Sequence, residues 1–269
     1  MTRFCAQSQN LDPAKADDSL REHQFVSVPP TSALLLHYPS GAKFASTIHH
    51  DSYPAIAQAD QRGRTVLITG ASKGIGRATA ISFAKAGAAN IIIAARSTAS
   101  TKWKKRSFLK LQLDVSSESS VADAVALVRQ TLDHLDILIN NAGYLEDWKP
   151  VAETDPEEWW KSWEVNIKGV YLMTRAFLPL LLQSSAKTIV NLSSAGAPRV
   201  RPGASAYQTT KFALLRFTEF VATEYADQGL VAFAIHPGGV PTELALNMPE
   251  QMHQVLVDTP QLAADSVTC

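Results

Sequence analysis

A glycine-rich turn between an apolar segment and an amphipathic segment constrains the fold of this sequence most. Residues 65–69 lead directly into GASKGIG at 70–76. Glycine at a strand-to-helix turn allows positive φ and lets a pyrophosphate approach the backbone, and the helix N-terminus adds free N–H groups and a positive dipole end. An ordinary glycine-rich loop is the alternative, but the strand before it and the helix after it favour a phosphate site. The predicted cofactor-binding residues of this turn are Gly70, Ser72, Lys73, Gly74, Ile75 and Gly76.

Short apolar segments alternate with amphipathic ones after the turn, which is typical of a parallel α/β sheet. The pattern predicts strands at 65–69, 89–95, 108–113, 136–140, 187–192 and 230–236, and helices near 74–86, 118–132, 156–182 and 205–227. We therefore expect a single domain, a doubly wound parallel sheet of the Rossmann type, over residues 64–269. Residues 1–24 are polar and predicted to be disordered, and residues 25–63 are predicted to be a lead-in that packs on the body.

Charge and composition exclude several classes of protein. Lys plus Arg number 25 and Asp plus Glu number 25, so the net charge is zero and nucleic acid is not an expected partner. No apolar run approaches the roughly 18 residues that span a bilayer, so no membrane partner is expected. The two cysteines, Cys5 and Cys269, lie at opposite ends of the chain, which favours a reducing compartment and a cytoplasmic protein.

The end of the second predicted strand indicates which dinucleotide would bind. A site for NAD places a carboxylate there to hold the ribose 2′-hydroxyl. This sequence has Ala95 and then Arg96, with Lys73 already in the glycine-rich turn. Two cations and no acid favour the 2′-phosphate of NADP, which guanidinium binds through two hydrogen bonds. A solvated surface arginine is the alternative.

A tyrosine and a lysine lie one helical turn apart at the start of the last predicted helix. Tyr207 and Lys211 share one helix face at i, i+4. Such a pair has little meaning alone, but a strand that ends in Ser193-Ser194 lies 13 residues before the tyrosine. The combination predicts a catalytic Ser194, Tyr207 and Lys211.

At this point the chain resembles the short-chain dehydrogenase/reductase family, whose motifs occur here in order. They are TGASKGIG at 69–76, Asp114-Val115, NNAG at 140–143, Asn166 in VNIKG, Ser194, Tyr207 with Lys211, and PGGVPT at 237–242. The stretch HHDSYPAI at 49–56 resembles the lead-in of fungal-type members, so a metal site at its two histidines is not expected and no metal is predicted.

The resemblance implies a role for each matching residue. Tyr207 would be the general acid, Lys211 would lower the pKa of the phenol and hold the nicotinamide ribose, and Ser194 would orient the substrate oxygen. Asn166 would position a water that relays protons to Lys211. The remaining residues that the resemblance implies for cofactor binding are Asp114, Asn141, Gly143, Lys168, Val240 and Thr242.

Two departures from the family pattern are visible in the sequence. The crossover before the strand at 108 is only 11 residues long (97–107) and has no apolar stripe, so its helix is expected to be absent or vestigial. The chain ends 27 residues after Thr242, so the last strand is expected to be missing and residues 230–235 to form an exposed sheet edge.

The resemblance predicts an NADP-dependent oxidoreductase that interconverts a ketone or aldehyde and an alcohol. Its substrate is expected to be small and moderately hydrophobic, as in fungal secondary metabolism, and the protein to be a homo-oligomer, a dimer or tetramer. The alternative is a catalytically impaired dinucleotide-binding or scaffold protein of the same fold. Trp159, Trp160 and Trp163 favour packing or an interface over a substrate pocket.

Overall fold

Six parallel strands form one sheet in this computed structural model, which describes residues 48–97 and 108–269. The strands are β1 (Thr65–Thr69), β2 (Asn90–Ala95), β3 (Phe108–Gln112), β4 (Ile137–Asn140), β5 (Thr188–Leu192) and β6 (Val231–Ile235). Their order in the sheet is β3-β2-β1-β4-β5-β6. The order reverses beside β1, which creates a crevice at the carboxyl ends of β1 and β4, where such sheets bind ligands. The predicted Rossmann-type sheet is confirmed, with strand ends within one residue of the prediction.

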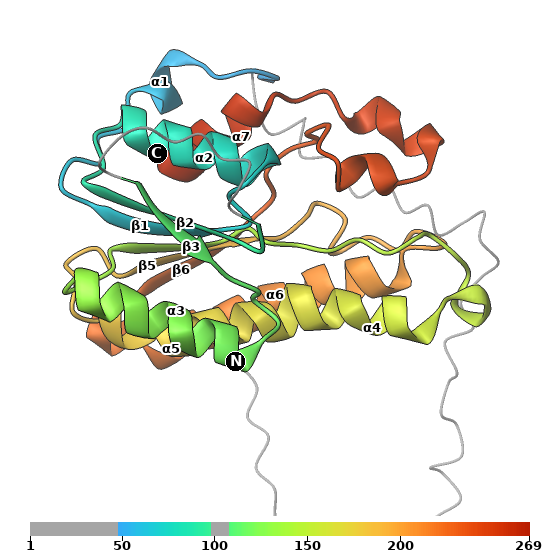
Figure 1. The fold of residues 1–269 in the computed structure, drawn as a ribbon. Helices are drawn as coiled ribbons and strands as arrows, with labels where there is room; N and C mark the ends of the chain where they lie inside the picture. The colour runs from blue at the N-terminus through green and yellow to red at the C-terminus, as the bar shows by residue number, and fades with distance from the viewer. Residues whose placement is uncertain (1–47, 98–107) are drawn as a thin grey trace, which may run out of the picture. The chain divides into compact units, whose positions relative to one another are not determined.

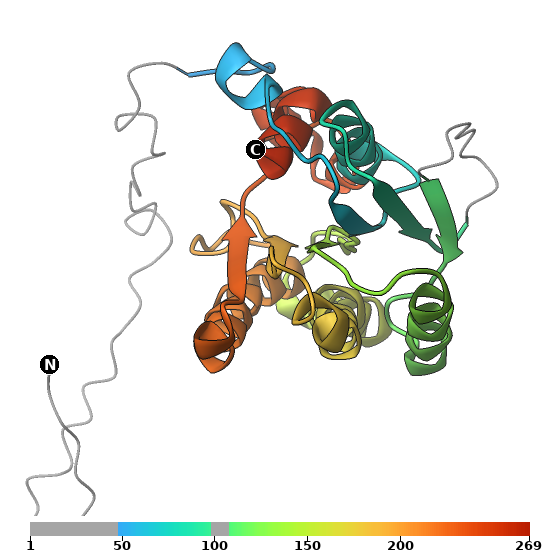
Figure 2. The ribbon, with the colours of Figure 1, turned by 90° about the vertical axis from the view of Figure 1, so that its left-hand side faces the viewer.

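Helices cover both faces of the sheet (Figures 1 and 2). One face carries α1, α2 and α7, and the other carries α3, α4, α5 and α6. The helices are α1 (Pro54–Ala57), α2 (Gly74–Lys85), α3 (Glu118–Thr131), α4 (Pro156–Trp163), α5 (Gly169–Leu181), α6 (Ser205–Glu224) and α7 (Pro260–Thr268). Short 3₁₀ turns are η2 (Val151–Glu153), η4 (Ala226–Gln228), η5 (Ala245–Asn247) and η6 (Glu250–Val255), and η3 (Glu164–Lys168) is a π-helical turn.

The alternation of side chains along the central strands builds a separate core on each face. In β1, Leu67 packs with Phe177 and Leu181 of α5, whereas Val66 and Ile68 pack with Phe83 of α2. All six side chains are fully buried. Burial of one such side chain stabilises the fold by about 1.5–3 kcal/mol. The two-sided burial explains why these strands are almost continuously apolar.

The long helix predicted at 156–182 is interrupted in the structure. Helix α4 ends at Trp163, the π-helical turn η3 follows, and α5 continues to Leu181. The wider turn carries Asn166, whose side chain is fully buried. A π-helical turn inside a helix is often found at a functional site, and a 3.6-residue period in the sequence cannot reveal it.

Helix α7 was not predicted, although its start is visible in the sequence. Thr259 caps the helix through a hydrogen bond from the Leu262 N–H, and Pro260 occupies the first turn, which is a recognised helix-start pattern. The helix packs along α2. Its buried Asp265 accepts hydrogen bonds from Ser52 and Ser82, both at 2.5 Å.

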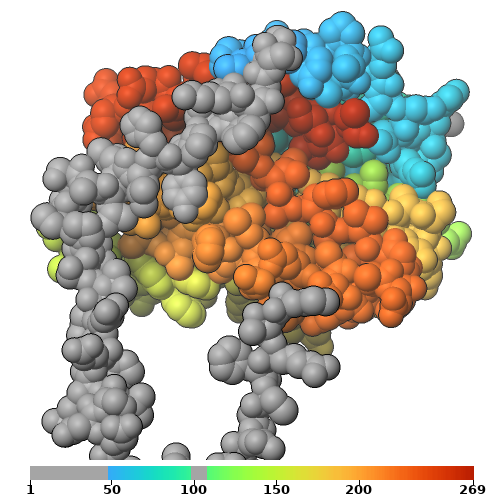
Figure 3. Space-filling view, turned by 180° about the vertical axis from the view of Figure 1, so that it is seen from behind, coloured from blue at the N-terminus to red at the C-terminus, as the bar shows by residue number. Residues whose placement is uncertain are grey.

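The segment before β1 is attached to the C-terminal segment by hydrogen bonds. The Thr259 N–H donates to the His50 carbonyl at 2.9 Å, and the Gln61 side chain donates to the Thr268 carbonyl at 2.7 Å. Seen from behind, the blue and red segments lie side by side (Figure 3). The boundary predicted at residue 24 lies outside the described residues, and the boundary predicted at residue 63 stays a prediction.

The predicted departures from the family pattern have different outcomes. The crossover at 98–107 lies outside the described residues. Strand β6 borders the sheet within the described residues, and its Val231 and Phe233 are 44% and 51% exposed. Across residues 48–97 and 108–269, no helix has the length and apolar character needed to cross a membrane.

Candidate active site

The glycine-rich turn connects β1 to α2 in a shape that leaves little room for a Cβ at its glycines. Gly70 and Gly74 have φ of +65° and +56°. A Cβ on Gly76 would lie 2.5 Å from the Asn141 Nδ2 and 2.7 Å from the Gly70 carbonyl oxygen. Lys73 occupies the N-cap position of α2 and has no side-chain acceptor for the first amides. These amides and the tight turn fit the pyrophosphate of a dinucleotide.

Asn141 attaches the end of β4 to this turn. Its Nδ2 donates to the Thr69 carbonyl at 2.8 Å and to the Gly70 carbonyl at 3.3 Å. Its backbone N–H donates to the Thr69 hydroxyl at 3.0 Å. Asn141 therefore fixes the shape of the turn from the neighbouring strand, and Gly143 follows it in the same partly buried loop.

Ser194, Tyr207 and Lys211 come together where β5 ends and α6 begins. The Lys211 Nζ donates to the Leu192 carbonyl at 2.7 Å and lies 5.6 Å from the centroid of the Tyr207 ring. The neighbouring Ser193 hydroxyl donates to the Lys211 carbonyl at 3.0 Å, which joins the end of β5 to α6. The site therefore has a phenol, a hydroxyl and a buried ammonium at one edge of the sheet.

Burial shifts the pKa values of both Tyr207 and Lys211. Burial raises the pKa of Tyr207 to about 12, a hydrogen bond with the Ser194 side chain lowers it, and the negative charge of Glu146 raises it. Burial lowers the pKa of Lys211 to about 8. The Lys211 ammonium donates to the Leu192 carbonyl, and its predicted effect on the phenol stays a prediction.

Asn166 braces two segments of the site with its side chain. Its Oδ1 accepts from the Tyr144 N–H at 2.8 Å, and its Nδ2 donates to the Tyr144 carbonyl at 2.9 Å and to the Thr210 hydroxyl at 3.1 Å. Thr210 in turn donates to the Tyr207 carbonyl at 2.7 Å. These contacts occupy both N–H groups of the amide, so its visible role is to position α6. The predicted water relay stays a prediction.

The loop after β6 approaches the glycine-rich turn. A Cβ on Gly74 would lie 3.2 Å from the Thr242 side chain. Lys73 forms an ion pair with Glu243 across this contact. Asp258 holds the base of the loop by accepting from the Gly239 N–H at 2.6 Å. Val240 is buried within the loop.

Arg96 and Asp114 lie near each other after β2 and β3. The Arg96 side chain is exposed. The pKa of Asp114 is lowered, chiefly by a hydrogen bond from the Ser116 hydroxyl and in part by the charge of Arg96. Lys168 lies at the end of η3 and is exposed. The predicted binding roles of these three residues stay predictions.

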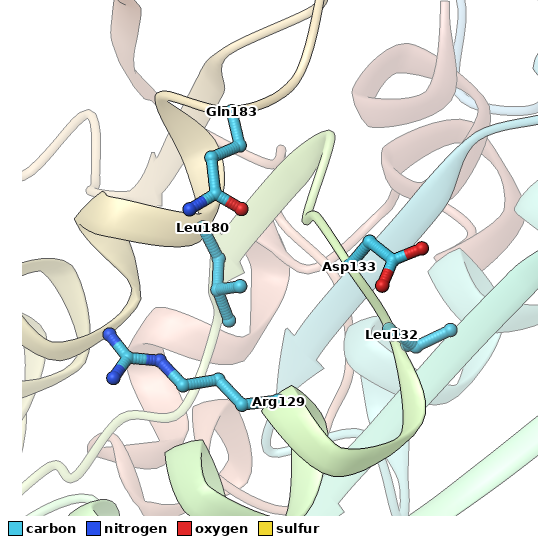
Figure 4. Close-up of a pocket in the computed structure, with 5 residues that line it drawn as sticks. All are labelled: Arg129, Leu132, Asp133, Leu180 and Gln183. Carbon is cyan, nitrogen blue, oxygen red and sulfur yellow. The ribbon is translucent and has the colours of Figure 1, made fainter.

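One hollow of the described surface lies near the site, and another lies far from it. A cavity of about 140 Å³ lies beside the site and is lined by Tyr144, Glu146, Asp147, Lys149, Thr154, Asp155, Glu158 and Trp159. An open hollow of about 490 Å³ is lined by Arg129, Leu132, Asp133, Leu180 and Gln183 (Figure 4). Since α3 leads into β4 and α5 into β5, the larger hollow lies at the amino ends of the strands, opposite the predicted site.

The three tryptophans of α4 form one aromatic cluster with ring centroids 6.0–6.3 Å apart. The Trp159 Nε1 donates to the Ser205 hydroxyl at 3.1 Å, so this ring packs toward the start of α6. Trp160 is 58% exposed. In the part of the chain that is described, no three His, Cys, Asp or Glu side chains gather as metal ligands would.

Comparison with known proteins decides the family. The model of the short chain dehydrogenase family matches residues 64–253. The chain belongs to the short-chain dehydrogenase/reductase family. Its members are oxidoreductases that act on CH–OH groups with NAD or NADP. The predicted use of a nicotinamide dinucleotide is therefore confirmed, and the family does not distinguish NAD from NADP.

Fungal short-chain dehydrogenases are among the similar proteins. The chain is 54% identical over 246 residues to the short chain dehydrogenase mpl6 of Monascus purpureus, which covers 86% of this chain and 84% of that protein. It is 45% identical over 236 residues to the short chain dehydrogenase andI of Emericella variicolor, covering 83% and 81% of the two chains. The fungal-type resemblance is therefore confirmed.

Solved structures of short-chain dehydrogenases and reductases have the same fold. A 3-ketoacyl-(acyl-carrier-protein) reductase from Brucella melitensis, complexed with NADH, matches with a TM-score of 0.72 and 30% identity over 77% of this chain and 90% of that chain. A short chain dehydrogenase from Burkholderia cenocepacia, in complex with NADP, matches with a TM-score of 0.70 and 27% identity over 78% and 84% of the chains. The two structures carry different dinucleotides.

Sequence reasoning missed two carboxylates of this site. Glu146 is buried and accepts a hydrogen bond from the Tyr207 N–H at 3.0 Å. Asp258 holds the Gly239 amide. Each lies far along the chain from its partner, and no local pattern in the sequence marks either of them.

Proposed function

We propose that the chain reduces a ketone or aldehyde to an alcohol with NADPH, and catalyses the reverse reaction. The observation that carries the proposal is that Tyr207 lies within hydrogen-bond reach of Ser194 and beside Lys211 at the end of β5, at the same edge of a parallel sheet as the glycine-rich turn. The carboxyl ends of parallel strands share one edge, so a dinucleotide on the turn and a carbonyl beside Tyr207 would meet there.

Three side chains divide the chemistry between them. The bound nicotinamide supplies the hydride. The Tyr207 hydroxyl donates a proton to the carbonyl oxygen, and the Ser194 hydroxyl donates a hydrogen bond that orients that oxygen. A phenol whose pKa is raised to about 12 is protonated at neutral pH, which suits a general acid in the reductive direction. The Lys211 ammonium places a positive charge beside the phenol.

We infer a preference for NADP over NAD from the charges around the end of β2. Ala95 leaves that position without a carboxylate, and Arg96 is exposed beside it. Lys73 adds a second cation in the glycine-rich turn. Guanidinium and ammonium groups favour a 2′-phosphate, which a 2′-hydroxyl lacks.

The proposed substrate is a small, moderately hydrophobic carbonyl compound of fungal secondary metabolism. Support comes from the apolar segment after Thr242, where Leu246 is 50% exposed, and from the short-chain dehydrogenases of Monascus and Emericella that resemble the chain. The segment after Thr242 carries no cluster of charge that would select an ionic substrate, and the loop at 195–204 contains two arginines, Arg199 and Arg201.

We also propose a cytoplasmic homo-oligomer. Tyr171 on α5 and Phe212 and Phe220 on α6 are 45%, 58% and 57% exposed, which is apolar surface that a second copy would cover. Within the described residues the cysteine at 269 is free, as a reducing compartment would keep it.

The decisive experiment measures NADPH binding and NADPH consumption separately. Binding is followed by cofactor fluorescence, and consumption is followed with a panel of aryl and alkyl ketones and aldehydes. The proposed enzyme binds NADPH and consumes it with at least one carbonyl. Binding without consumption across the panel would favour the impaired dinucleotide-binding protein instead.

The variant Tyr207→Phe tests the assignment of the proton donor. It removes one hydroxyl and keeps the ring, so turnover is expected to fall at least about 100-fold while NADPH binding stays within about twofold of the wild-type value. Turnover at the wild-type rate would refute the assigned role of Tyr207.

A further inference from the structure

Helix α6 carries Tyr207 in its first turn but has no cap from its own sequence. The N-cap residue is Ala204, whose methyl group accepts no hydrogen bond, and the first turn has no acidic residue. Helices are usually capped by a nearby Ser, Thr, Asp or Asn that accepts from the second or third amide. In α6 the third amide belongs to Tyr207 itself.

Glu146 occupies the place of the missing cap. Its Oε1 accepts from the Tyr207 N–H at 3.0 Å, although 61 positions separate the two residues. A carboxylate at a helix N-terminus also interacts favourably with the helix dipole. The residue that carries the phenol is therefore held directly by this carboxylate.

The carboxylate of Glu146 is buried and is itself held in place. Glu146 is 3% exposed, and its Oε2 accepts from the Ser162 hydroxyl of α4 at 2.6 Å. Among the described residues no cationic side chain forms an ion pair with it. Burial of an unpaired carboxylate costs free energy. For Glu146, two hydrogen bonds and the dipole of α6 offset this cost.

A second contact joins α4 to the same turn of α6. The Trp159 Nε1 donates to the hydroxyl of Ser205, the first residue of α6. Asn166 holds the backbone of Tyr144 on both sides, two residues before Glu146. The segment that supplies the carboxylate and the turn that receives it are thus both attached to the α4–η3 helix.

We propose that Glu146 is a positioning residue for the reaction, and that its buried carboxylate caps the first turn of α6 and holds Tyr207 in place for proton donation. This inference rests on the proposed function, because it assigns Glu146 a role through Tyr207. Its negative charge also raises the pKa of Tyr207. Glu146 therefore affects both the position of the Tyr207 phenol and its pKa.

Three variants separate the two effects of Glu146: the hydrogen bond that it accepts from the Tyr207 N–H, called the anchor here, and its negative charge. Glu146→Ala removes both. Glu146→Gln keeps an oxygen that can accept from the Tyr207 N–H and removes the charge. Ser162→Ala keeps the charge and removes one of the contacts that hold it. Asp147→Asn is the matched control, because it removes one negative charge from the adjacent, exposed residue.

Amide hydrogen exchange of the peptide 205–211 tests the anchor without any substrate. Exchange is expected to accelerate at least about tenfold in Glu146→Ala, and less in Ser162→Ala, because hydrogen bonds to a charged acceptor are stronger than neutral ones. Glu146→Gln and Asp147→Asn are expected to stay near wild type. Wild-type exchange in Glu146→Ala would overturn the proposal.

An NMR titration of the Tyr207 Cζ resonance tests the effect of the Glu146 charge. The signal is assigned by its absence in Tyr207→Phe. Ionisation of Tyr207 is expected to begin at lower pH in Glu146→Gln than in the wild type, because a negative charge no longer opposes the phenolate. In Asp147→Asn, Tyr207 is expected to ionise over the same pH range as in the wild type. Equal titration of all three proteins would contradict the effect of the Glu146 charge.

Kinetics connects both effects to turnover of the best carbonyl of the panel. In Glu146→Ala kcat is expected to fall about 10- to 100-fold with KM for NADPH nearly unchanged, because a displaced acid group affects the reaction step. In Glu146→Gln most of the wild-type kcat is expected to be retained. The rate of carbonyl reduction, which falls at high pH as Tyr207 ionises, is expected to fall at a lower pH than in the wild type. A wild-type kcat and pH profile in the Glu146 variants overturns this inference, whereas an active Tyr207→Phe overturns the proposed function.

Discussion

Lys73 of the glycine-rich turn forms an ion pair with Glu243, the residue after Thr242 in the loop beyond β6. Both side chains are exposed, at 66% and 72%. The same lysine is a proposed ligand of the NADP 2′-phosphate. Glu243 therefore neutralises, in part, one of the two cations on which the cofactor preference depends.

Glu243→Gln is expected to strengthen NADPH binding about two- to fivefold, because an exposed ion pair is worth about 0.2–1 kcal/mol and its loss frees Lys73. NADH affinity is expected to stay constant, since NADH has no 2′-phosphate. Fluorescence titrations at low salt measure both affinities. Glu250→Gln, in η6, is the control, and an equal gain for NADH would contradict the role of Lys73.

Arg96→Asp is expected to weaken NADPH binding at least about tenfold, or about 1.4 kcal/mol, and NADH binding far less. The change replaces a guanidinium with a carboxylate at the end of β2, where an acid suits a ribose hydroxyl. Lys85→Asp makes the same change of charge at the far end of α2 and should leave both affinities alone. Equal losses for the two cofactors in Arg96→Asp would refute the assignment.

Gly76→Ala is expected to reduce NADPH affinity more than tenfold, because the new Cβ would lie 2.5 Å from the Asn141 Nδ2 and deform the turn. Gly63→Ala is the control for a general effect of alanine. Its Cβ would have no heavy atom within 4 Å, although its φ of +79° makes the substitution strained. The control is therefore expected to cost about 1 kcal/mol of stability and to leave NADPH affinity unchanged. Normal binding by Gly76→Ala would argue against a phosphate site here.

Lys211 is expected to make stability depend on pH in the alkaline range. Burial lowers its pKa from 10.5 to about 8, so between these values the unfolded chain binds a proton that the folded chain has lost. Stability rises with pH wherever the unfolded state binds more protons. The wild type should therefore gain roughly 2–3 kcal/mol over Lys211→Met between about pH 8 and pH 10. Urea denaturation at several pH values measures the difference, with Lys85→Met as the exposed control; a constant difference would contradict the buried ammonium.

Asp265→Ala is expected to destabilise the fold by about 2–4 kcal/mol, because Ser52 and Ser82 lose a charged acceptor and α7 loses its attachment to α2. Glu224→Ala, at the exposed end of α6, is the control. Chemical denaturation gives both values. A loss below about 0.5 kcal/mol would show that Asp265 is not needed to dock α7.

The strands, the glycine-rich turn and the spacing of Tyr207 and Lys211 could be predicted from the sequence. Each is encoded in a few consecutive residues: an apolar run of five, a turn that needs glycine, or two side chains one helical turn apart. The π-helical turn at Asn166 could not be predicted, because one widened turn leaves no trace in the period of apolar residues. Helix α7 has a visible start at Thr259-Pro260, but the short segment after it has too few residues to show a helical period.

The sequence by itself determined the order of the strands along the chain, the glycine-rich turn and the identities of the proposed reactive groups, because these depend on short-range patterns. Only the tertiary structure decided what surrounds those groups. Glu146 reaches Tyr207 because α4 packs against α6, and Lys211 reaches the Leu192 carbonyl because α6 packs on β6, the strand beside β5. Contacts between residues far apart in the chain arise when the whole sheet is assembled and its faces are buried, and they set the pKa values that the reactive side chains have in the folded protein.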